Sequence, residues 1–116
     1  MNQAERLDRT FAVLSDSTRR AMLARLEREE ALSVSELARP HPIKLPAIMK
    51  HLDVLADAGL ITRAKTGRTV TVRLQPKPMR EAMEWLRRYE RFWNTSLDRL
   101  TLLAEAREAE ARKAGR

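Results

Sequence analysis

The stretch LPAIMKHLDVLADAGLI, residues 45–61, decides the fold of this chain. Its apolar residues recur with steps of three, four and three, which places four side chains on one face of a helix: Leu45, Ile48, Leu52 and Leu55. Pro46 suits the first turn of a helix, where backbone N–H groups lack partners, and Gly59 suits the left-handed residue that ends one. The sequence therefore predicts a helix over residues 45–58 that buries this stripe.

Three helices are predicted ahead of this one. The first runs to about residue 14, and its spacing predicts a buried face made of Ala4, Leu7, Phe11 and Leu14. The second spans about residues 18–29, is capped by the polar cluster before it, and buries Met22, Leu23 and Leu26. The third starts at Ser33, which matches a capping box with Glu36, and cannot pass Pro40. Two short helices joined by a proline-rich turn, the second ending in glycine, indicate a helix-turn-helix.

After Gly59 the hydrophobic period changes from that of a helix to that of a strand. Val70, Val72 and Leu74 alternate with polar residues, and residues 61–64 can pair with them. The basic segment 65–68 is the expected tip of the hairpin. A basic hairpin over residues 61–74, directly after a helix-turn-helix, is typical of the wing of a winged helix-turn-helix domain.

A long helix is predicted over residues 79–104. Its apolar stripe is broader than a small domain needs for its own core and consists of Met79, Ala82, Trp85, Leu86, Tyr89, Phe92, Trp93, Leu97, Leu100 and Leu103. Residues 105–116 are Ala-rich and charged, which predicts a frayed helical extension or a disordered tail. We therefore expect one mainly α domain over residues 1–104, with about five helices and a two-stranded wing, followed by a charged tail over 105–116.

Composition restricts the functions open to the chain. Its 116 residues suffice for one domain, and the absence of Cys excludes disulfides and thiolate chemistry. Most of the net charge of +7 comes from residues 44–80, where eight bases stand against two acids. Such a local excess favours a polyanionic partner, nucleic acid before an anionic membrane. No segment has the apolar length of a membrane span, so we expect a soluble, cytoplasmic protein.

Three segments carry a resemblance: LSDSTRRAMLARLE (residues 14–27), SVSELA (33–38) and KHLDVLADAGLI (50–61). Followed by the basic hairpin, they resemble the ArsR/SmtB family of winged helix-turn-helix transcriptional regulators. The similarity extends over about residues 4–103. It implies a homodimer that binds operator DNA and leaves it, or rearranges on it, when an effector binds. The long last helix resembles the branch of the family without metal ligands.

The chain departs from the metal-sensing members of this family. Ser33 and Ser35 stand where those members have a Cys-x-Cys pair, and hydroxyls cannot replace thiolates for a soft ion. The family's other metal site uses Asp, His and Glu of the last helix, but this chain has no His after His51. We therefore expect no metal site and no cofactor. Lys44 stands where many members have a capping Ser, so it adds charge and gives up the cap.

Three groups of residues are predicted to contact DNA. The helix over residues 45–58 enters the major groove with Lys44, Pro46, Ala47, Lys50 and His51. The wing over residues 61–74 meets the backbone or the minor groove through Arg63, Lys65 and Arg68. The start of the second helix is predicted to contact a phosphate through Thr18, Arg19 and Arg20. The plainer alternatives are solvent-facing turns, charged guards of a strand edge, and an ordinary capped helix start, respectively.

The resemblance implies dimerisation through the first and last helices, with predicted contacts from Leu7, Phe11, Trp85, Tyr89, Phe92, Trp93, Leu97 and Leu100. The aromatic residues have two other interpretations, which are packing in the core and a small-molecule pocket between those helices with the Tyr89 hydroxyl as its polar group. No catalytic arrangement or Gly-rich phosphate loop is present, so we predict no enzyme activity.

The sequence thus predicts a homodimeric regulator, a repressor, that binds an inverted-repeat operator of double-stranded DNA. The sequence leaves open the operator sequence, the identity of a small-molecule effector, and whether binding represses or activates transcription. The alternative from another class is a dimeric protein-interaction module that uses the aromatic last helix and binds no DNA. The position of the charge excess, on the predicted wing side, favours the regulator.

Overall fold

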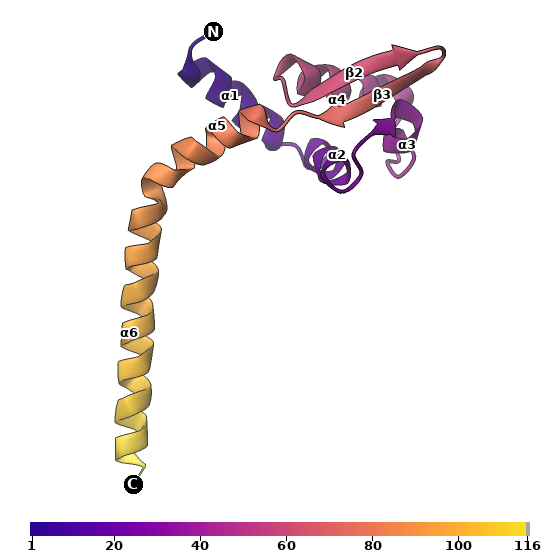
Figure 1. The fold of residues 1–116 in the computed structure, drawn as a ribbon. Helices are drawn as coiled ribbons and strands as arrows, with labels where there is room; N and C mark the ends of the chain where they lie inside the picture. The colour runs from indigo at the N-terminus through magenta and orange to yellow at the C-terminus, as the bar shows by residue number, and fades with distance from the viewer. Residues whose placement is uncertain (116) are drawn as a thin grey trace. The chain divides into compact units, whose positions relative to one another are not determined.

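A computed structural model describes residues 1–115 of the chain, which forms two compact units, one over Met1–Ala82 and a second that begins at Met83. The first unit contains α1 (Gln3–Leu14), α2 (Ser17–Arg28), β1 (Leu32–Ser33), α3 (Val34–Ala38), α4 (Leu45–Asp57), β2 (Ile61–Thr66), β3 (Thr69–Leu74) and the start of α5 (Lys77–Leu86) (Figure 1). The predicted fold class, mainly helical with a small antiparallel sheet, is confirmed.

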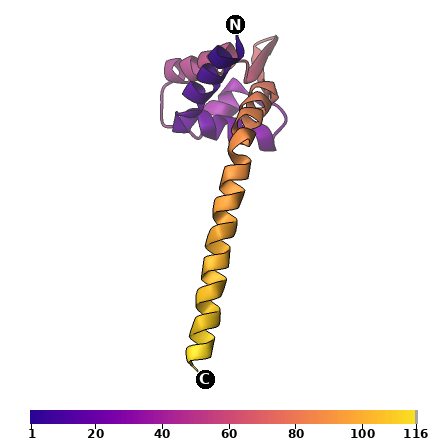
Figure 2. The ribbon, with the colours of Figure 1, turned by 90° about the vertical axis from the view of Figure 1, so that its left-hand side faces the viewer.

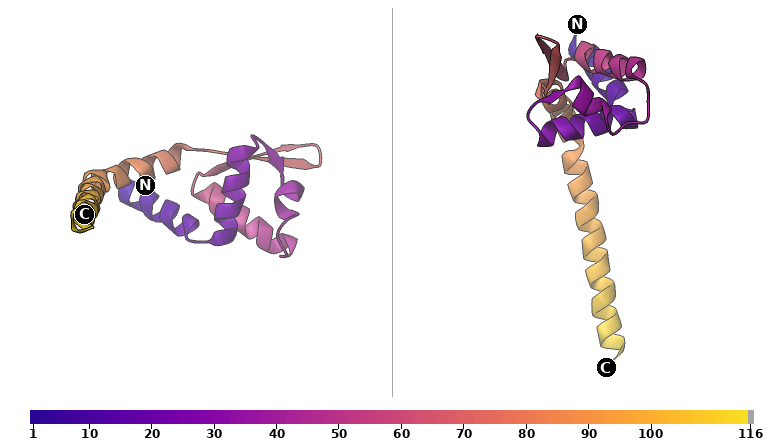
Figure 3. Two further views of the ribbon diagram at one scale, coloured as in Figure 1. Left: turned by 90° about the horizontal axis from the view of Figure 1, so that it is seen from below. Right: turned by 90° about the vertical axis from the view of Figure 1, so that its right-hand side faces the viewer.

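The sheet contains one strand more than the predicted two-stranded wing. Its order is β1-β3-β2, and the short β1 pairs antiparallel with β3 through Leu32 opposite Val72. β2 and β3 form the predicted hairpin, which extends beyond the helices of this unit (Figures 1 and 3). The tip is tighter than the predicted 65–68, because Thr66 still pairs with Thr69 and only two residues make the turn. Gly67 takes a φ of +62°, the left-handed conformation that a turn of this kind requires at its first central position.

The core of the first unit lies between α2, α3, α4 and the sheet. Its buried apolar side chains are Val13, Met22, Leu23, Leu26, Leu32, Leu37, Ile48, Leu52, Leu55, Leu60, Ile61 and Val72. The predicted faces of α2 and α4 are confirmed except at Leu45, which is 58% exposed. Leu45 begins α4, one turn before the first buried residue of that helix, so the core covers the stripe only from Ile48 onward.

The buried face of α1 differs from the prediction. Leu7, Thr10 and Val13 are buried, whereas Phe11 is 37% exposed. Thr10 can lie inside although it is polar, because its hydroxyl donates a hydrogen bond to the carbonyl of Arg6 at 3.1 Å. Apolar spacing alone therefore selected a face that is rotated from the real one.

An ion pair joins α1 to the start of α5. Arg6 donates from Nε and Nη2 to the carboxylate of Glu81, with a shortest distance of 2.8 Å. This hydrogen bond lowers the pKa of Glu81 below its usual value, and the charge of Arg6 acts in the same direction. Within the first unit, this ion pair ties the start of α5 to α1.

The second unit is helical. A 3-10 turn over Arg87–Tyr89 follows α5, and α6 then runs from Glu90 to Ala114 without interruption (Figure 2). The prediction of one helix over 79–104 is wrong at this turn, which coincides with an edge-on contact of the Trp85 and Tyr89 rings at 5.4 Å. α6 also continues past residue 104 into the predicted tail, and the domain boundary placed there stays a prediction. No helix within residues 1–115 is long and apolar enough to span a membrane.

The capping box predicted at the start of α3 is present and can be tested. Ser33 accepts a hydrogen bond from the backbone N–H of Glu36, and the Glu36 carboxylate accepts one from the N–H of Ser33. Ser33→Ala is expected to lower the free energy of unfolding by about 1 kcal/mol because the N–H of Glu36 loses its acceptor. Ser35→Ala, in the same helix, is the control and is expected to change it by less than about 0.5 kcal/mol. Urea unfolding measures both, and equal losses would contradict a capping role for Ser33.

Candidate nucleic-acid interface

The outward face of α4 is basic at its start. Lys44, Pro46 and Lys50 are exposed, whereas Ala47 is half-buried on the same half of the helix. Lys44 occupies the cap position and makes no side-chain hydrogen bond to the helix, as the sequence predicts. Its ammonium group and that of Lys50 are therefore available to an anionic partner beside the first turns of α4.

His51 points toward α2. Its Nδ1 lies 3.9 Å from the Asp16 carboxylate, and the imidazole keeps 21% of its surface exposed. Asp16 in turn caps α2, and the N–H of Arg19 lowers the pKa of its carboxyl group, with a smaller contribution from the charge of Arg19. The predicted base contact of His51 stays a prediction, with one side of the ring turned to the protein.

The tip of the wing presents two exposed cations. Lys65 and Arg68 are exposed, and neither side chain makes a hydrogen bond or ion pair with any other residue in the part of the chain that the structure describes. Arg63, the third predicted wing contact, is placed differently: its Nη1 lies 2.7 Å from the carboxylate of Asp53 on α4. This pair ties β2 to α4.

Sequence reasoning missed Asp53. The only signal for its contact with Arg63 is opposite charge at a separation of ten positions, and many other pairs in a chain with 34% charged residues meet that condition. The ion pair is partly exposed, so its net contribution to stability is small, roughly 0–1 kcal/mol. Its effect on the candidate interface is geometric, because it fixes the position of the wing relative to α4.

The start of α2 has the features of an ordinary capped helix, which is the alternative to a phosphate contact. Arg19 donates from Nε to the carbonyl of Val13 at 3.0 Å, and Arg20 donates from Nη1 to the carbonyl of Leu14 at 2.7 Å. Both guanidinium groups thus serve the carboxyl end of α1, and Thr18 beside them is half-buried. Phosphate contacts by these three residues stay a prediction.

The predicted dimer residues of the last helices are mostly exposed. Tyr89, Phe92, Trp93, Leu97 and Leu100 keep between 47% and 64% of their surface accessible, and α6 buries no residue. Core packing therefore does not account for these side chains. Trp85 is half-buried, and Leu7 on α1 is 8% exposed, already covered within its own subunit.

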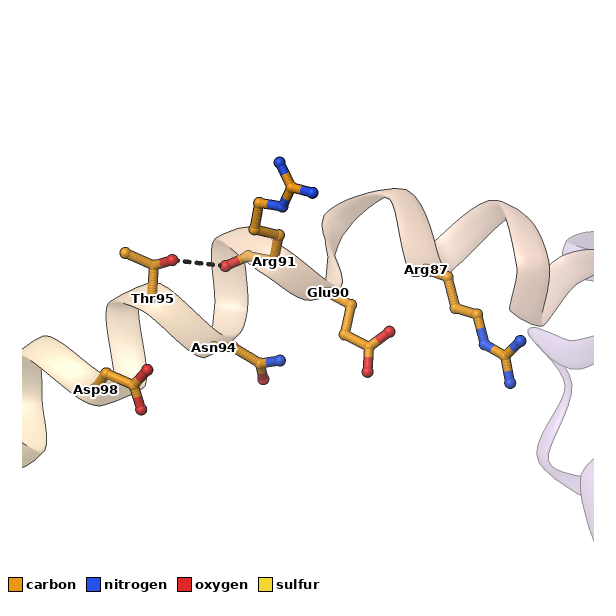
Figure 4. A pocket seen from close by; sticks show the side chains of 6 residues that line it. All are labelled: Arg87, Glu90, Arg91, Asn94, Thr95 and Asp98. Atoms are coloured by element: carbon orange, nitrogen blue, oxygen red, sulfur yellow. Dashed lines mark hydrogen bonds between the residues drawn. The ribbon is translucent and has the colours of Figure 1, made fainter.

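One hollow of this region does not match the predicted small-molecule pocket. A shallow hollow along the second unit is lined only by polar side chains of consecutive helical turns, namely Arg87, Glu90, Arg91, Asn94, Thr95 and Asp98 (Figure 4). Thr95 donates its hydroxyl hydrogen to the Arg91 carbonyl, so it also serves its own helix. Among residues 1–115, no group of three or more His, Cys, Asp or Glu is arranged to hold a metal ion.

Comparison with known proteins shows that the chain is similar to transcriptional regulators with a helix-turn-helix domain. A family model described as a helix-turn-helix domain matches residues 14–64. The HTH-type transcriptional regulator Rv2034 of Mycobacterium tuberculosis is 37% identical over 90 residues, which cover 78% of this chain and 80% of that protein.

Two solved structures extend the likeness to the fold. The crystal structure of an ArsR family transcriptional regulator is 40% identical, with a TM-score of 0.73 over 78% of this chain and 93% of that one. An ArsR-like transcriptional regulator from Rhodococcus sp. RHA1 is 33% identical, with a TM-score of 0.66 over 87% of this chain and 94% of that one. All three proteins are transcriptional regulators, not enzymes.

The double variant Lys50→Gln with Arg68→Gln tests the basic face. It is expected to weaken binding to sheared genomic DNA and to flatten the plot of log affinity against log salt by about 0.9 for each phosphate that the variant no longer neutralises. Arg28→Gln with Arg99→Gln removes the same charge from exposed positions outside residues 44–80 and is expected to leave the slope unchanged. Equal slopes for the wild type and the first variant would show that DNA binds elsewhere.

Proposed function

This chain belongs to the ArsR family of winged helix-turn-helix transcriptional regulators, and from that premise we propose that it is a homodimeric repressor of an inverted-repeat operator. The observation that carries the proposal is a set of cations whose side chains have no partner within residues 1–115: Lys50 on α4 and Lys65 with Arg68 at the wing tip. The Arg63–Asp53 ion pair holds these two elements together. One protein face can then meet a major groove and the adjoining backbone at once.

The proposed docking uses the outward residues of α4 for the groove. Lys50 donates to guanine O6 and N7 or to a phosphate, Ala47 meets a thymine methyl group, and the exposed edge of His51 reads a base. Lys44 and Pro46, at the start of the helix, lie beside the sugar-phosphate backbone of the DNA. The wing supplies sequence-independent affinity through Lys65 and Arg68, with Arg63 behind them.

Exposed apolar side chains support the proposed dimer. A soluble chain rarely leaves so many large hydrophobic residues along one helix without a partner, and aromatic residues are enriched in protein interfaces. We propose that Trp93, Leu97 and Leu100 of the last helix, together with Phe11 of the first, are covered by the second subunit. An effector that changes this interface would change DNA binding.

Two-fold symmetry sets the form of the operator. A symmetric dimer places two copies of α4 on one side of the DNA, so each half-site is read in the opposite direction. The half-site centres should be about 34–36 Å apart, one helical turn, or a multiple of that distance. We propose repression because a dimer bound to an operator that overlaps a promoter would block access of the transcription machinery to that DNA.

Selection from a pool of random-sequence DNA duplexes tests the proposed function. The wild-type protein is expected to enrich duplexes with an inverted repeat at the spacing given above, bound with one dimer per duplex. Enrichment of a single unrepeated site would contradict the symmetric dimer. No enrichment at all, together with no salt-dependent binding to any duplex, would favour the protein-interaction module.

Leu97→Glu tests the proposed dimer contact. Burial of a leucine side chain is worth about 1.5–3 kcal/mol, so the substitution is expected to raise the dimer dissociation constant by roughly one to two orders of magnitude. Leu102→Glu is the matched control, since Leu102 is similarly exposed on the same helix but lies off the predicted stripe. Sedimentation equilibrium measures both, and the same result for both variants would disprove the assigned face.

A further inference from the structure

The carboxyl end of the recognition helix α4 is completed by a residue of α1. Two backbone hydrogen bonds close the helix in a Schellman turn, from Leu60 N–H to the Leu55 carbonyl at 3.0 Å and from Gly59 N–H to the Ala56 carbonyl at 2.9 Å. The carbonyl of Asp57, the last residue of the helix, instead accepts a hydrogen bond from Nη1 of Arg9, at 3.3 Å. This hydrogen bond spans 48 positions of the chain.

The hydrogen bond from Arg9 brings a positive charge to an end of α4 that is negative. A helix carries partial negative charge at its carboxyl end, where a cation is stabilising. The last turn of α4 has no basic residue, and Asp57 adds a carboxylate there. Arg9 therefore supplies from another helix the positive charge that α4 lacks.

α1, which carries Arg9, is itself fixed on both sides of this residue. Arg6 holds Glu81 of α5 before it, and the carbonyls of Val13 and Leu14 after it accept hydrogen bonds from Arg19 and Arg20 of α2. The buried side chains of α1 anchor the helix between these bonds. A displacement of α1 would therefore carry Arg9 with it and change the support of α4.

We propose that Arg9 is a positioning residue for DNA binding, which links α1 to the carboxyl end of the recognition helix and holds that helix in the orientation that fits the operator. Its role differs from that of Lys50 or Arg68, because its guanidinium group contacts protein backbone. The proposal rests on the proposed function for its effect on DNA, but the support that Arg9 gives to α4 is measurable without DNA.

Amide hydrogen exchange of the free protein tests the support first. Arg9→Met is expected to speed exchange in the last turn of α4 and at Gly59 and Leu60 by roughly three- to tenfold, because opening of this helix end becomes easier. Amides of α2 serve as the internal reference. Arg99→Met, an exposed arginine in the interior of α6 whose side chain makes no hydrogen bond or ion pair among the described residues, is the matched control and should change neither region. Unchanged exchange in Arg9→Met would overturn the proposal, whether or not the chain binds an operator.

Titration against the duplex that the wild type selects tests the consequence. Arg9→Met should bind it roughly five- to tenfold more weakly while the slope of log affinity against log salt stays the same, since the protein neutralises the same number of phosphates. Arg9→Lys, which keeps the charge and a donor, should recover most of the affinity. A slope reduced by about 0.9 would instead show that Arg9 binds a phosphate, and unaltered affinity would show a purely structural cap. Either result overturns the proposed role.

Discussion

Burial of one face of α4 is the constraint on which the rest of the site depends. Ile48, Leu52 and Leu55 have no exposed surface, and each such burial is worth about 1.5–3 kcal/mol. A rotation of α4 by one residue position, about 100°, would bring this stripe to the surface. The helix has no second face of three fully buried residues that could replace it in the core. Lys50 therefore points outward because the opposite face of α4 is buried. The same packing fixes the position of the wing, which follows α4 directly after Gly59.

Hydrophobic spacing predicted the fold where burial depends on one helix face alone. It identified the inner faces of α2 and α4 and the alternation of β3, but it failed at α1, where Thr10 is buried because its hydroxyl is satisfied on the preceding turn. β1 escaped prediction because two residues carry no periodic signal, and their pairing with β3 is a tertiary event. The 3-10 turn after Leu86 has no Pro or Gly to announce it.

The exposure of the candidate site residues was predictable to the extent that helix register determines it. Register alone indicates that Pro46 and Lys50 share the face opposite Ile48, and position in the hairpin indicates that Arg68 lies at its tip. The partners of the other arginines were not predictable. A guanidinium group at the end of a long flexible side chain reaches carbonyls and carboxylates from distant segments, so that Arg63 meets Asp53 and Arg20 meets a carbonyl of α1.

Net charge and hydrogen bonding therefore carry different information about the same residue type. Residues 1–43 are electrically neutral in sum, yet four of their arginines hold helix ends: Arg9 at α4, Arg19 and Arg20 at α1, and Arg25 at the Glu36 carbonyl of α3. Each supplies a donor and a positive charge to carbonyls near the carboxyl end of a helix, where the helix carries partial negative charge. Bases whose donors are already used within the fold have less to offer a phosphate, because a new hydrogen bond must compete with the old one. For that reason Lys50 on α4 and Lys65 and Arg68 at the wing tip, whose side chains have no partner among the described residues, are a better guide to the predicted DNA-facing surface than the charge excess of the whole chain.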